Sequence, residues 1–373
     1  MTSLRDARPG DALEVTAFLR RLGLVMPGGD EAAIAHWQAL WVANPALEVH
    51  GEKAALGWIL EDADQIVGFF GNIPQVSYFD GRPVKISSAR AWAVDKAYRS
   101  ETPRLCEAFF DQSGADVVLI SSASAPARRR CLEFGGARMP QADYDKIIYW
   151  VLDANRFIQA GLRKKGQSAL SAWIGGMLGG VALNARMRLG GRRPFAPLQD
   201  ISVLSIDAID DSFDDLWSRK LMECPGRLLA CRNAETLRWY FGLSQNADKS
   251  RVLCCRQDGK LQGYAVVVRE DSFAIGLKRI KIADVFVAGD DSKVIDALLT
   301  AAYEYGLAEH CHVLEVIGLP DNLRRQTRSH KPFERPMPTF PFFFKALSPE
   351  LTGPLAQDDS WYVTAFDGDT ALL

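Results

Sequence analysis

The chain has 373 residues, of which 48% are hydrophobic and 24% charged, and its net charge is −2. Such a composition is typical of a globular protein, its length suits two domains, and it excludes a disordered or fibrous chain. The first residues lack the apolar core of a signal peptide, and the seven cysteines have no regular spacing. We therefore expect a cytoplasmic protein with reduced thiols and no bound metal.

The N-terminal part of the chain predicts an α+β unit. Alternating apolar residues flank turn-forming pairs at 63–64 and 80–81, which indicates two antiparallel hairpins. The predicted elements are, in chain order, a helix beginning at 11, a Trp-rich helix at 36–41, strands at 57–62, 65–70 and 89–94, a helix at 103–112, a strand at 116–121 and a helix at 126–134.

A basic segment at 154–199 follows, and it contains no acidic residue. It carries eight Lys and Arg residues of a chain with net charge −2, so the remaining residues sum to −10. Apolar residues recur every three or four positions from Leu170 to Ala185, opposite four glycines, which predicts an amphipathic linker helix. We expect this helix to lie on an anionic membrane surface, where each cation adds about 1 kcal/mol. The residues expected there are Lys164, Lys165, Trp173, Ile174, Met177, Leu178, Arg186 and Arg188.

The same pattern also fits a connector helix whose apolar stripe is buried against protein, or a contact with nucleic acid. Four glycines weaken a free helix by about 1 kcal/mol each. A span across the membrane is not expected, because the run is barely long enough and contains Gln167, Ser168, Ser171 and Asn184. We expect an anionic membrane surface rather than nucleic acid as the partner.

The C-terminal part repeats the order of the N-terminal elements. The repeated elements are helices within 206–221 and at 236–241, strands at 251–255, 261–268 and 281–287, a helix at 292–306 and a strand at 312–317. The sequence therefore predicts two tandem α+β domains, at 1–153 and 200–373, joined by the basic linker at 154–199.

The passage from Val94 to Ser100 resembles the strand-to-loop passage of the GCN5-related N-acetyltransferase (GNAT) family, Val-x-Pro-x-Tyr-Arg-Gly. Downstream, the family's helix pattern Asn-x-x-Ala-x-x-x-Tyr-x-x-x-Gly-Phe is similar to the stretch with Ser124, Ala127, Cys131, Gly135 and Gly136. The resemblance covers the N-terminal domain in detail and the C-terminal domain by element order. It implies an α+β fold of two tandem GNAT-like acyl-CoA N-acyltransferase domains joined by the basic amphipathic linker helix.

In that family a glycine-rich loop brings backbone N–H groups to the phosphates of the donor. Here the matching loop at 99–104 has no glycine but offers polar donors, whereas its counterpart at 288–293 contains Asp290 and Asp291, which would repel phosphates. We therefore expect the N-terminal domain to bind acyl-CoA as a substrate, with no permanently bound cofactor. The resemblance implies these donor-binding residues: Ala93, Val94, Tyr98, Arg99, Ser100, Thr102 and Arg104.

Amide formation from a thioester needs a donor to the developing oxyanion and an acceptor for the proton of the amine. The resemblance implies a backbone N–H at Ala93 or Val94 for the oxyanion, and it puts Cys131 where the family has a proton-donating tyrosine. Cys131 also fits a small buried apolar residue. The other catalytic candidates are Glu315 in a predicted strand and Tyr362, Asp367 and Asp369 in the aromatic tail at 360–369. A structural ion pair for Glu315 and a solvated turn for the tail stay open.

The layout of tandem domains, glycine-poor loop, cationic linker and aromatic tail resembles bacterial ceramide synthases. This implies transfer of a long-chain acyl group from acyl-CoA to the amine of a sphingoid-type lipid base, by a peripheral protein on the inner face of the cell membrane. The apolar stretch with Phe333, Phe340, Phe342, Phe343 and Phe344 is a candidate wall for the acyl chain, although such a cluster is more often core. The alternatives are a Fem-type aminoacyl-tRNA-dependent transferase and a non-catalytic membrane adaptor with two degenerate domains.

Overall fold

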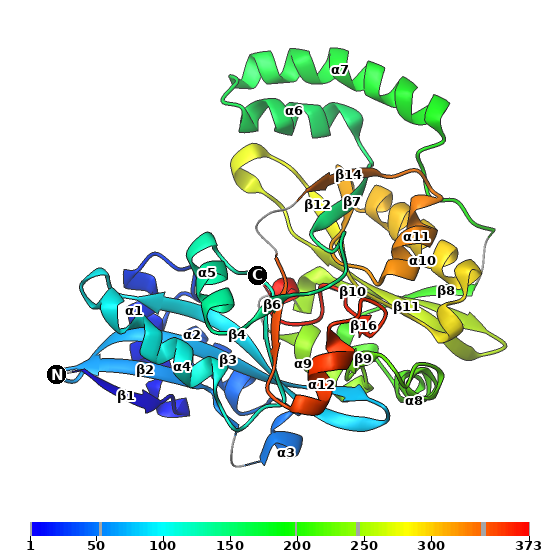
Figure 1. Ribbon diagram of the computed structural model, residues 1–373. Helices are drawn as coiled ribbons and strands as arrows, with labels where there is room; N and C mark the ends of the chain where they lie inside the picture. Colours follow the sequence, from blue (N-terminus) through cyan, green and yellow to red (C-terminus); the bar gives the residue numbers. More distant parts are fainter. Residues whose placement is uncertain (1, 52–53, 198–199, 244–246, 337–340, 373) are drawn as a thin grey trace.

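The computed structural model describes residues 2–51, 54–197, 200–243, 247–336 and 341–372 (Figure 1). It is an α+β structure built on two mixed sheets. The first sheet has the strand order β1 (Ser3–Asp6), β2 (Gly57–Asp62), β3 (Gln65–Phe79), β4 (Arg82–Val94), β5 (Val117–Ile120), β15 (Phe343–Ala346) and β6 (Ala137–Arg138). Two short strands, β9 (Leu228–Ala230) and β16 (Trp361–Tyr362), extend it beside the far end of β3.

The second sheet repeats this plan. Its order is β8 (Asp200–Leu204), β10 (Ser250–Gln257), β11 (Lys260–Arg269), β12 (Arg279–Val287), β13 (Val313–Val316), β7 (Lys146–Val151) and β14 (Phe333–Pro336). In both sheets one central pair is parallel, β4 with β5 and β12 with β13, among antiparallel neighbours. Two sheets of one topology agree with the expected tandem GNAT-like units.

Each sheet is completed by a strand from the other part of the chain. β15, which follows the second unit, lies between β5 and β6 of the first sheet, with Phe343 opposite Ile120 on one side and Arg138 on the other. β7, which precedes the basic segment, lies between β13 and β14 of the second sheet. The proposed boundaries at 153 and 200 stay a prediction, and this exchange means that neither segment alone contains a full sheet.

The helices flank the sheets and form the connections (Figure 1). In the first unit they are α1 (Ala12–Arg21), α2 (Asp30–Trp41), α3 (Leu47–His50), α4 (Thr102–Phe110) and α5 (Ala125–Glu133). In the second they are α8 (Ser212–Glu223), α9 (Ala234–Gly242), α10 (Ser292–Ala308) and α11 (Asp321–Arg328), whereas α12 (Pro349–Leu355) packs against β15 of the first sheet. One continuous core cluster contains Trp37 and Phe69 of the first unit together with Tyr264 of the second, so the two units pack on each other.

The basic segment forms two helices rather than the single predicted one. α6 (Ala154–Lys164) and α7 (Ala169–Gly190) pack side by side and project from the second unit as a hairpin, here called the arm (154–190; Figure 1). Among the residues that the structure describes, no helix is long and apolar enough to cross a membrane.

The aromatic tail is buried, which rules out the solvated turn that the sequence had left open, since Asp367 and Asp369 are 6% and 3% exposed. Every residue from Ser360 to Thr370 is buried, and the tail runs between the two units (Figure 1). The described part of the phenylalanine stretch packs in the core, in agreement with the core interpretation and not with an acyl groove. Phe342, Phe343 and Phe344 are buried in the apolar clusters of the first sheet, Phe333 stacks on Tyr149, and Phe340 lies outside the described residues.

Candidate active site

A cavity of about 910 Å³ opens where the parallel strands of the first sheet separate. β5 pairs with β4 only between Ile86 and Ser88, so the rest of β4, from Ala89 to Val94, continues without β5 beside it. The cavity is lined by Leu24, Val25, Met26, His36, Trp37, Ala89, Arg90, Ala91, Trp92, Ala93, Val94, Arg99, Thr102, Ile120, Ser122, Ala123, Ser124, Pro126, Ala127, Arg129, Arg130 and Asp369.

A β-bulge shapes the β4 wall of this cavity. The register with β3 runs from Phe69 opposite Ala93 to Gly71 opposite Arg90, so Ala91 and Trp92 together face one residue of β3, and Ala91 has a φ of 54°. A Cβ on Gly71 would collide with the carbonyl oxygen of Arg90, which explains a glycine there. Bulges re-aim the backbone beside active sites, because the extra residue leaves the ladder of hydrogen bonds.

Cationic side chains and two helix starts surround part of the cavity. Arg99 and Thr102 come from the loop before α4 and its first turn, and Arg129 and Arg130 come from α5. Each of these two arginines forms an ion pair of 2.8 Å with Glu133, which leaves the group net positive. Helix starts and arginines are the features that bind phosphate groups.

A carboxylate from the chain's far end reaches the same cavity. Asp369 is 3% exposed, and its Oδ1 accepts hydrogen bonds from Ser121 Oγ (2.6 Å) and Ser122 Oγ (3.0 Å). Its backbone N–H donates to Ser121 Oγ (3.0 Å), and Arg90 forms an ion pair with Oδ2 at 3.5 Å. The C-terminal tail therefore supplies a polar group to a cavity formed mainly by the first unit.

His36 on α2 also lines the cavity and stays uncharged at neutral pH. Burial, with a smaller contribution from the positive charge of Arg90, lowers its pKa to about 4. Its ring lies edge-on to that of Trp37, with 5.0 Å between the ring centroids, and the indole N–H of Trp37 donates to Thr16 Oγ1 (2.9 Å). A neutral imidazole that lines this cavity can accept a proton transiently.

The lowered pKa of His36 predicts that the free energy of unfolding decreases at acidic pH. Between pH 6.5 and 4 the unfolded chain protonates His36 while the folded chain does not, so stability is lost as pH falls through this window. At pH 4 the loss is about 3 kcal/mol relative to pH 7. Urea unfolding of wild type and His36→Gln at pH 7, 5 and 4 measures it. Parallel losses in both proteins would contradict the assignment, because only wild type carries this group.

The structure brings five of the sequence-predicted residues together. Ala93, Val94, Arg99, Thr102 and Asp369 all line the cavity. Three others line a separate shallow hollow, where Tyr98 Oη donates to Asp62 (2.8 Å) and Arg104 pairs with Glu101 (3.0 Å), with Ser100 beside them. The short 3-10 helix at 96–101 separates these two groups, because with three residues per turn Arg99 and Thr102 lie on one side and Tyr98, Glu101 and Arg104 on another.

The structure does not bring the other four catalytic candidates to the cavity. Cys131 is fully buried in the core of the first unit, and burial raises its pKa to about 12. Glu315 is buried in β13, paired with Arg335 at 2.7 Å, in agreement with its interpretation as a structural ion pair. Tyr362 Oη donates to the carbonyl of Val285 (2.7 Å), and Asp367 is paired with Arg232 (3.0 Å). All four side chains have internal partners or apolar surroundings.

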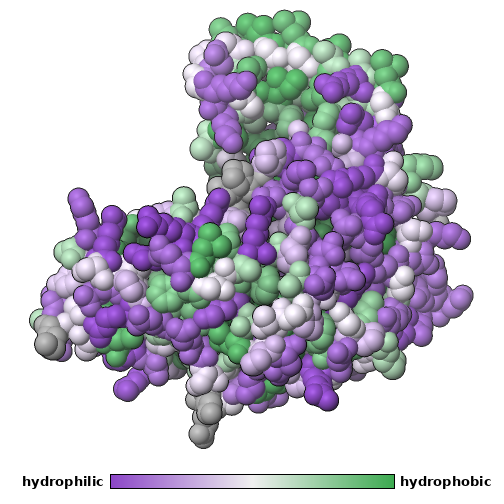
Figure 2. Space-filling view, in the orientation of Figure 1, coloured by the Kyte–Doolittle hydropathy of each residue, from purple (hydrophilic) through white to green (hydrophobic). Residues whose placement is uncertain are grey.

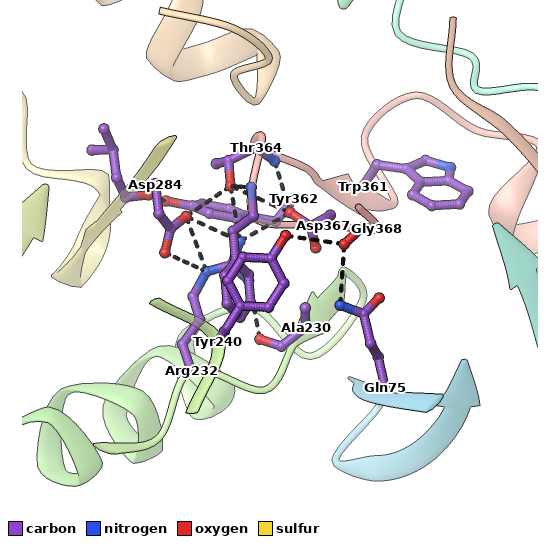
Figure 3. Close-up of polar contacts among 12 residues, drawn as sticks. Gln75, Ala230, Arg232, Tyr240, Asp284, Trp361, Tyr362, Thr364, Asp367 and Gly368 are labelled. Atoms are coloured by element: carbon purple, nitrogen blue, oxygen red, sulfur yellow. Dashed lines mark hydrogen bonds and ion pairs between the residues drawn. The ribbon is translucent and has the colours of Figure 1, made fainter. Parts of the chain in front are cut away.

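In the second unit the tail covers the corresponding part of β12 (Figure 3). There β12 and β13 pair only as far as Ile282 and Val316, so Asp284 occupies the position that Arg90 has in β4. Asp284 accepts from Thr364 Oγ1 (2.7 Å), and Arg232 bridges it to Asp367 (3.0 Å to each). Arg232 and Thr364 therefore already occupy the carboxylate of Asp284, which would otherwise face a ligand in the second unit.

Sequence reasoning missed several residues of the cavity. Arg90, His36 and Trp37 come from a strand and a helix whose patterns indicated only core. Arg129 and Arg130 had a usable signal, since they lie in the run of three arginines after Ser124 at the start of a predicted helix. Among the described residues, no group of three or more His, Cys, Asp and Glu side chains lies close enough to hold a metal ion.

The fold is similar to that of solved N-acetyltransferase structures. A GCN5-related N-acetyltransferase from Anabaena variabilis aligns with a TM-score of 0.59 at 12% identity, over 93% of this chain and 73% of that one. A conserved protein from Enterococcus faecalis, described as a probable N-acyltransferase, aligns with a TM-score of 0.59 at 8% identity and the same coverage. A GCN5-related N-acetyltransferase from Kribbella flavida aligns with a TM-score of 0.56 at 12% identity, over 93% and 71%. The sequence matches no family model, and comparison with curated proteins finds no match.

Proposed function

We propose that this GNAT-fold protein is an acyl-CoA-dependent N-acyltransferase with one active site, the cavity of the first unit. One observation carries the proposal: a cationic group and a buried carboxylate line the same cavity, at the point where two parallel strands separate. The cationic group suits the phosphates of the donor, and the carboxylate suits an amine. The corresponding part of the second unit is bound by the chain's own tail, which favours a single site.

The donor would lie along β4 with its phosphates at the arginines. Arg99 and Arg129 neutralise phosphate charge, while the bulged backbone at Ala91–Val94 presents N–H groups toward the thioester. The absence of glycine from the loop at 99–104 shifts phosphate binding from backbone groups to these side chains.

The reaction would join the amine nitrogen to the thioester carbon. As the tetrahedral oxyanion forms, a backbone N–H of the bulge stabilises it, and the nitrogen loses a proton to Asp369 or to the neutral imidazole of His36, which both line the cavity. The C–S bond then breaks, and the released thiolate takes a proton from solvent. Asp369 would also attract the ammonium form of the acceptor, because it is the carboxylate that lines this cavity.

We further propose that the acyl group is long and that the acceptor is a sphingoid-type lipid base, so that the product is a ceramide-like amide. The apolar part of the cavity supports this, since Leu24, Met26, Trp37 and Trp92 offer a wall for hydrocarbon. The protein would reach such a substrate as a peripheral protein on the inner face of the cell membrane.

A donor series tests the proposal. Amide formation from a sphinganine-like amine is followed by mass spectrometry with acetyl-, octanoyl- and palmitoyl-CoA in detergent. We expect rates to rise with chain length, because each buried methylene contributes up to about 0.8 kcal/mol. Arg99→Glu with Arg129→Glu should raise KM for the donor by at least about tenfold, whereas Lys293→Glu, at the equivalent loop of the second unit, should leave it unchanged.

Each alternative predicts a different result in this assay. Comparable rates with acetyl- and palmitoyl-CoA would indicate a small-molecule acetyltransferase on the same fold. An effect of Lys293→Glu equal to that of the double variant would move the donor to the second unit. No turnover with any thioester would contradict the proposal and favour an aminoacyl-tRNA-dependent transferase or a non-catalytic adaptor.

A further inference from the structure

The two helices of the arm are held together by glycines of α7. A Cβ on Gly176 would lie 2.9 Å from the carbonyl oxygen of Asn155, and one on Gly180 would collide with the side chain of the same residue. A Cβ on Gly175 or Gly179 would meet side chains of α6 as well. These residues let the backbones approach closely, so the glycine face of α7 is the face that packs against α6.

This packing leaves the apolar face of α7 outward. Buried residues of the helix are small, Ala172, Gly176 and Gly180. The large apolar side chains are exposed: Leu178 (72%), Val181 (69%), Leu170 (67%), Trp173 (51%), Met177 (49%) and Ile174 (47%). Figure 2 shows the resulting hydrophobic surface along the end of the projecting arm. Contiguous apolar surface of this kind on a folded chain marks an interaction site.

Positive charge brackets this surface at both ends. Lys164 and Lys165 lie at the turn between the helices, Arg186 and Arg188 lie near the end of α7, and none of them pairs with an acidic residue in the part of the chain that the structure describes. The arm's acid-free segment contrasts with the rest of the chain, which sums to −10. An anionic surface would therefore attract the arm and repel the body.

We propose that the arm docks on an anionic lipid bilayer, with α7 lying along the headgroup region and α6 between it and the second unit. An apolar stripe with flanking cations is the pattern of helices that lie in the membrane interface. A second copy of the chain fits less well, because two arms meeting face to face would bring like charges together. Nucleic acid fits less well too, because the middle of the face is uncharged and Trp173 is its one aromatic residue.

Docking of the arm would extend the proposed function, because it would bring the cavity close to a lipid substrate. The evidence for docking comes from the arm alone. The two ideas can fail separately. Lipid binding is measured on vesicles without substrate, and amide formation is measured in detergent without vesicles.

Flotation with vesicles tests the docking. Wild type should float with vesicles of phosphatidylglycerol and phosphatidylcholine and much less with phosphatidylcholine alone. Trp173→Ser/Ile174→Ser/Leu178→Ser should weaken binding by at least about tenfold, and Arg186→Glu/Arg188→Glu should do so most clearly at low salt. The matched control is Val203→Ser/Met222→Ser, which removes exposed apolar side chains elsewhere (50% and 76% exposed) and should bind like wild type.

Further measurements keep the result interpretable. Circular dichroism and a thermal midpoint equal to wild type should show that the variants fold, and their turnover of octanoyl-CoA in detergent should be unchanged. Unaltered vesicle binding by the triple serine variant would overturn the proposal. Sedimentation showing a dimer that this variant disperses would replace the membrane with a second copy, and binding to RNA in preference to vesicles would replace it with nucleic acid.

Discussion

Replacing Asp369 by asparagine is expected to lower kcat for amide formation by about 100-fold to 10,000-fold, the usual contribution of a positioned general acid or base. Asparagine keeps the acceptor oxygen for Ser121 and Ser122, which hold Asp369 at 2.6 and 3.0 Å, so the tail should stay in place. The carboxylate charge, which would attract the amine and take its proton, is lost. Steady-state kinetics with palmitoyl-CoA and a sphinganine-like amine measures the change.

Asp359→Asn provides the matched control, because that residue is an exposed acid directly before the tail and outside the cavity. It should retain wild-type activity. Thermal midpoints within a few degrees for both variants would show that the loss in Asp369→Asn is chemical. A kcat for Asp369→Asn within threefold of wild type would remove Asp369 from the mechanism and leave His36 as the proton acceptor.

Replacing Arg232 by leucine is expected to produce the largest loss of stability. Its guanidinium is fully buried, bridges Asp284 and Asp367 at 3.0 Å each and lies 4.8 Å from the ring of Phe366 (Figure 3). Burial by itself raises the pKa of Asp367, and the charge of Arg232 opposes that rise. Without the cation two buried carboxylates remain uncompensated, which costs about 3–5 kcal/mol.

Urea unfolding at pH 7 should show this loss, and activity should fall with it because the tail that carries Asp369 is anchored by Asp367. The control is a variant in which the whole charged group becomes apolar, Arg232→Met/Asp284→Leu/Asp367→Leu. Since an apolar group of similar volume can replace a buried ion pair at little cost, it should recover part of the stability. Equal stability of wild type and Arg232→Leu would show that the network does not hold the tail.

The elements of this fold could be predicted because their signals are local. Strands at 57–62 and 65–70 appear as β2 and the start of β3, the turn at 80–81 joins β3 to β4, and the helix at 103–112 appears as α4. Part of the cavity lining was predictable as well, since Val94 and Arg99 lie on the passage that resembles the family motif. Tyr98 of this passage and Arg104 beyond it line a separate hollow instead. A sequence motif could not predict this, because it does not say to which side of a short helix each residue turns.

Residues far apart in the chain decided the rest. The sequence by itself determined the hydrophobic periodicity of the helices and strands, the turns, the acid-free segment and the apolar stripe of α7, since each depends on neighbouring residues. Only the tertiary structure decided that β7 and β15 exchange sheets, that Asp369 rather than Asp367 reaches the cavity, and that glycines rather than the stripe of α7 face α6. Ser121 and Asp369 are 248 positions apart, and no local pattern encodes which buried partners the packed chain brings together.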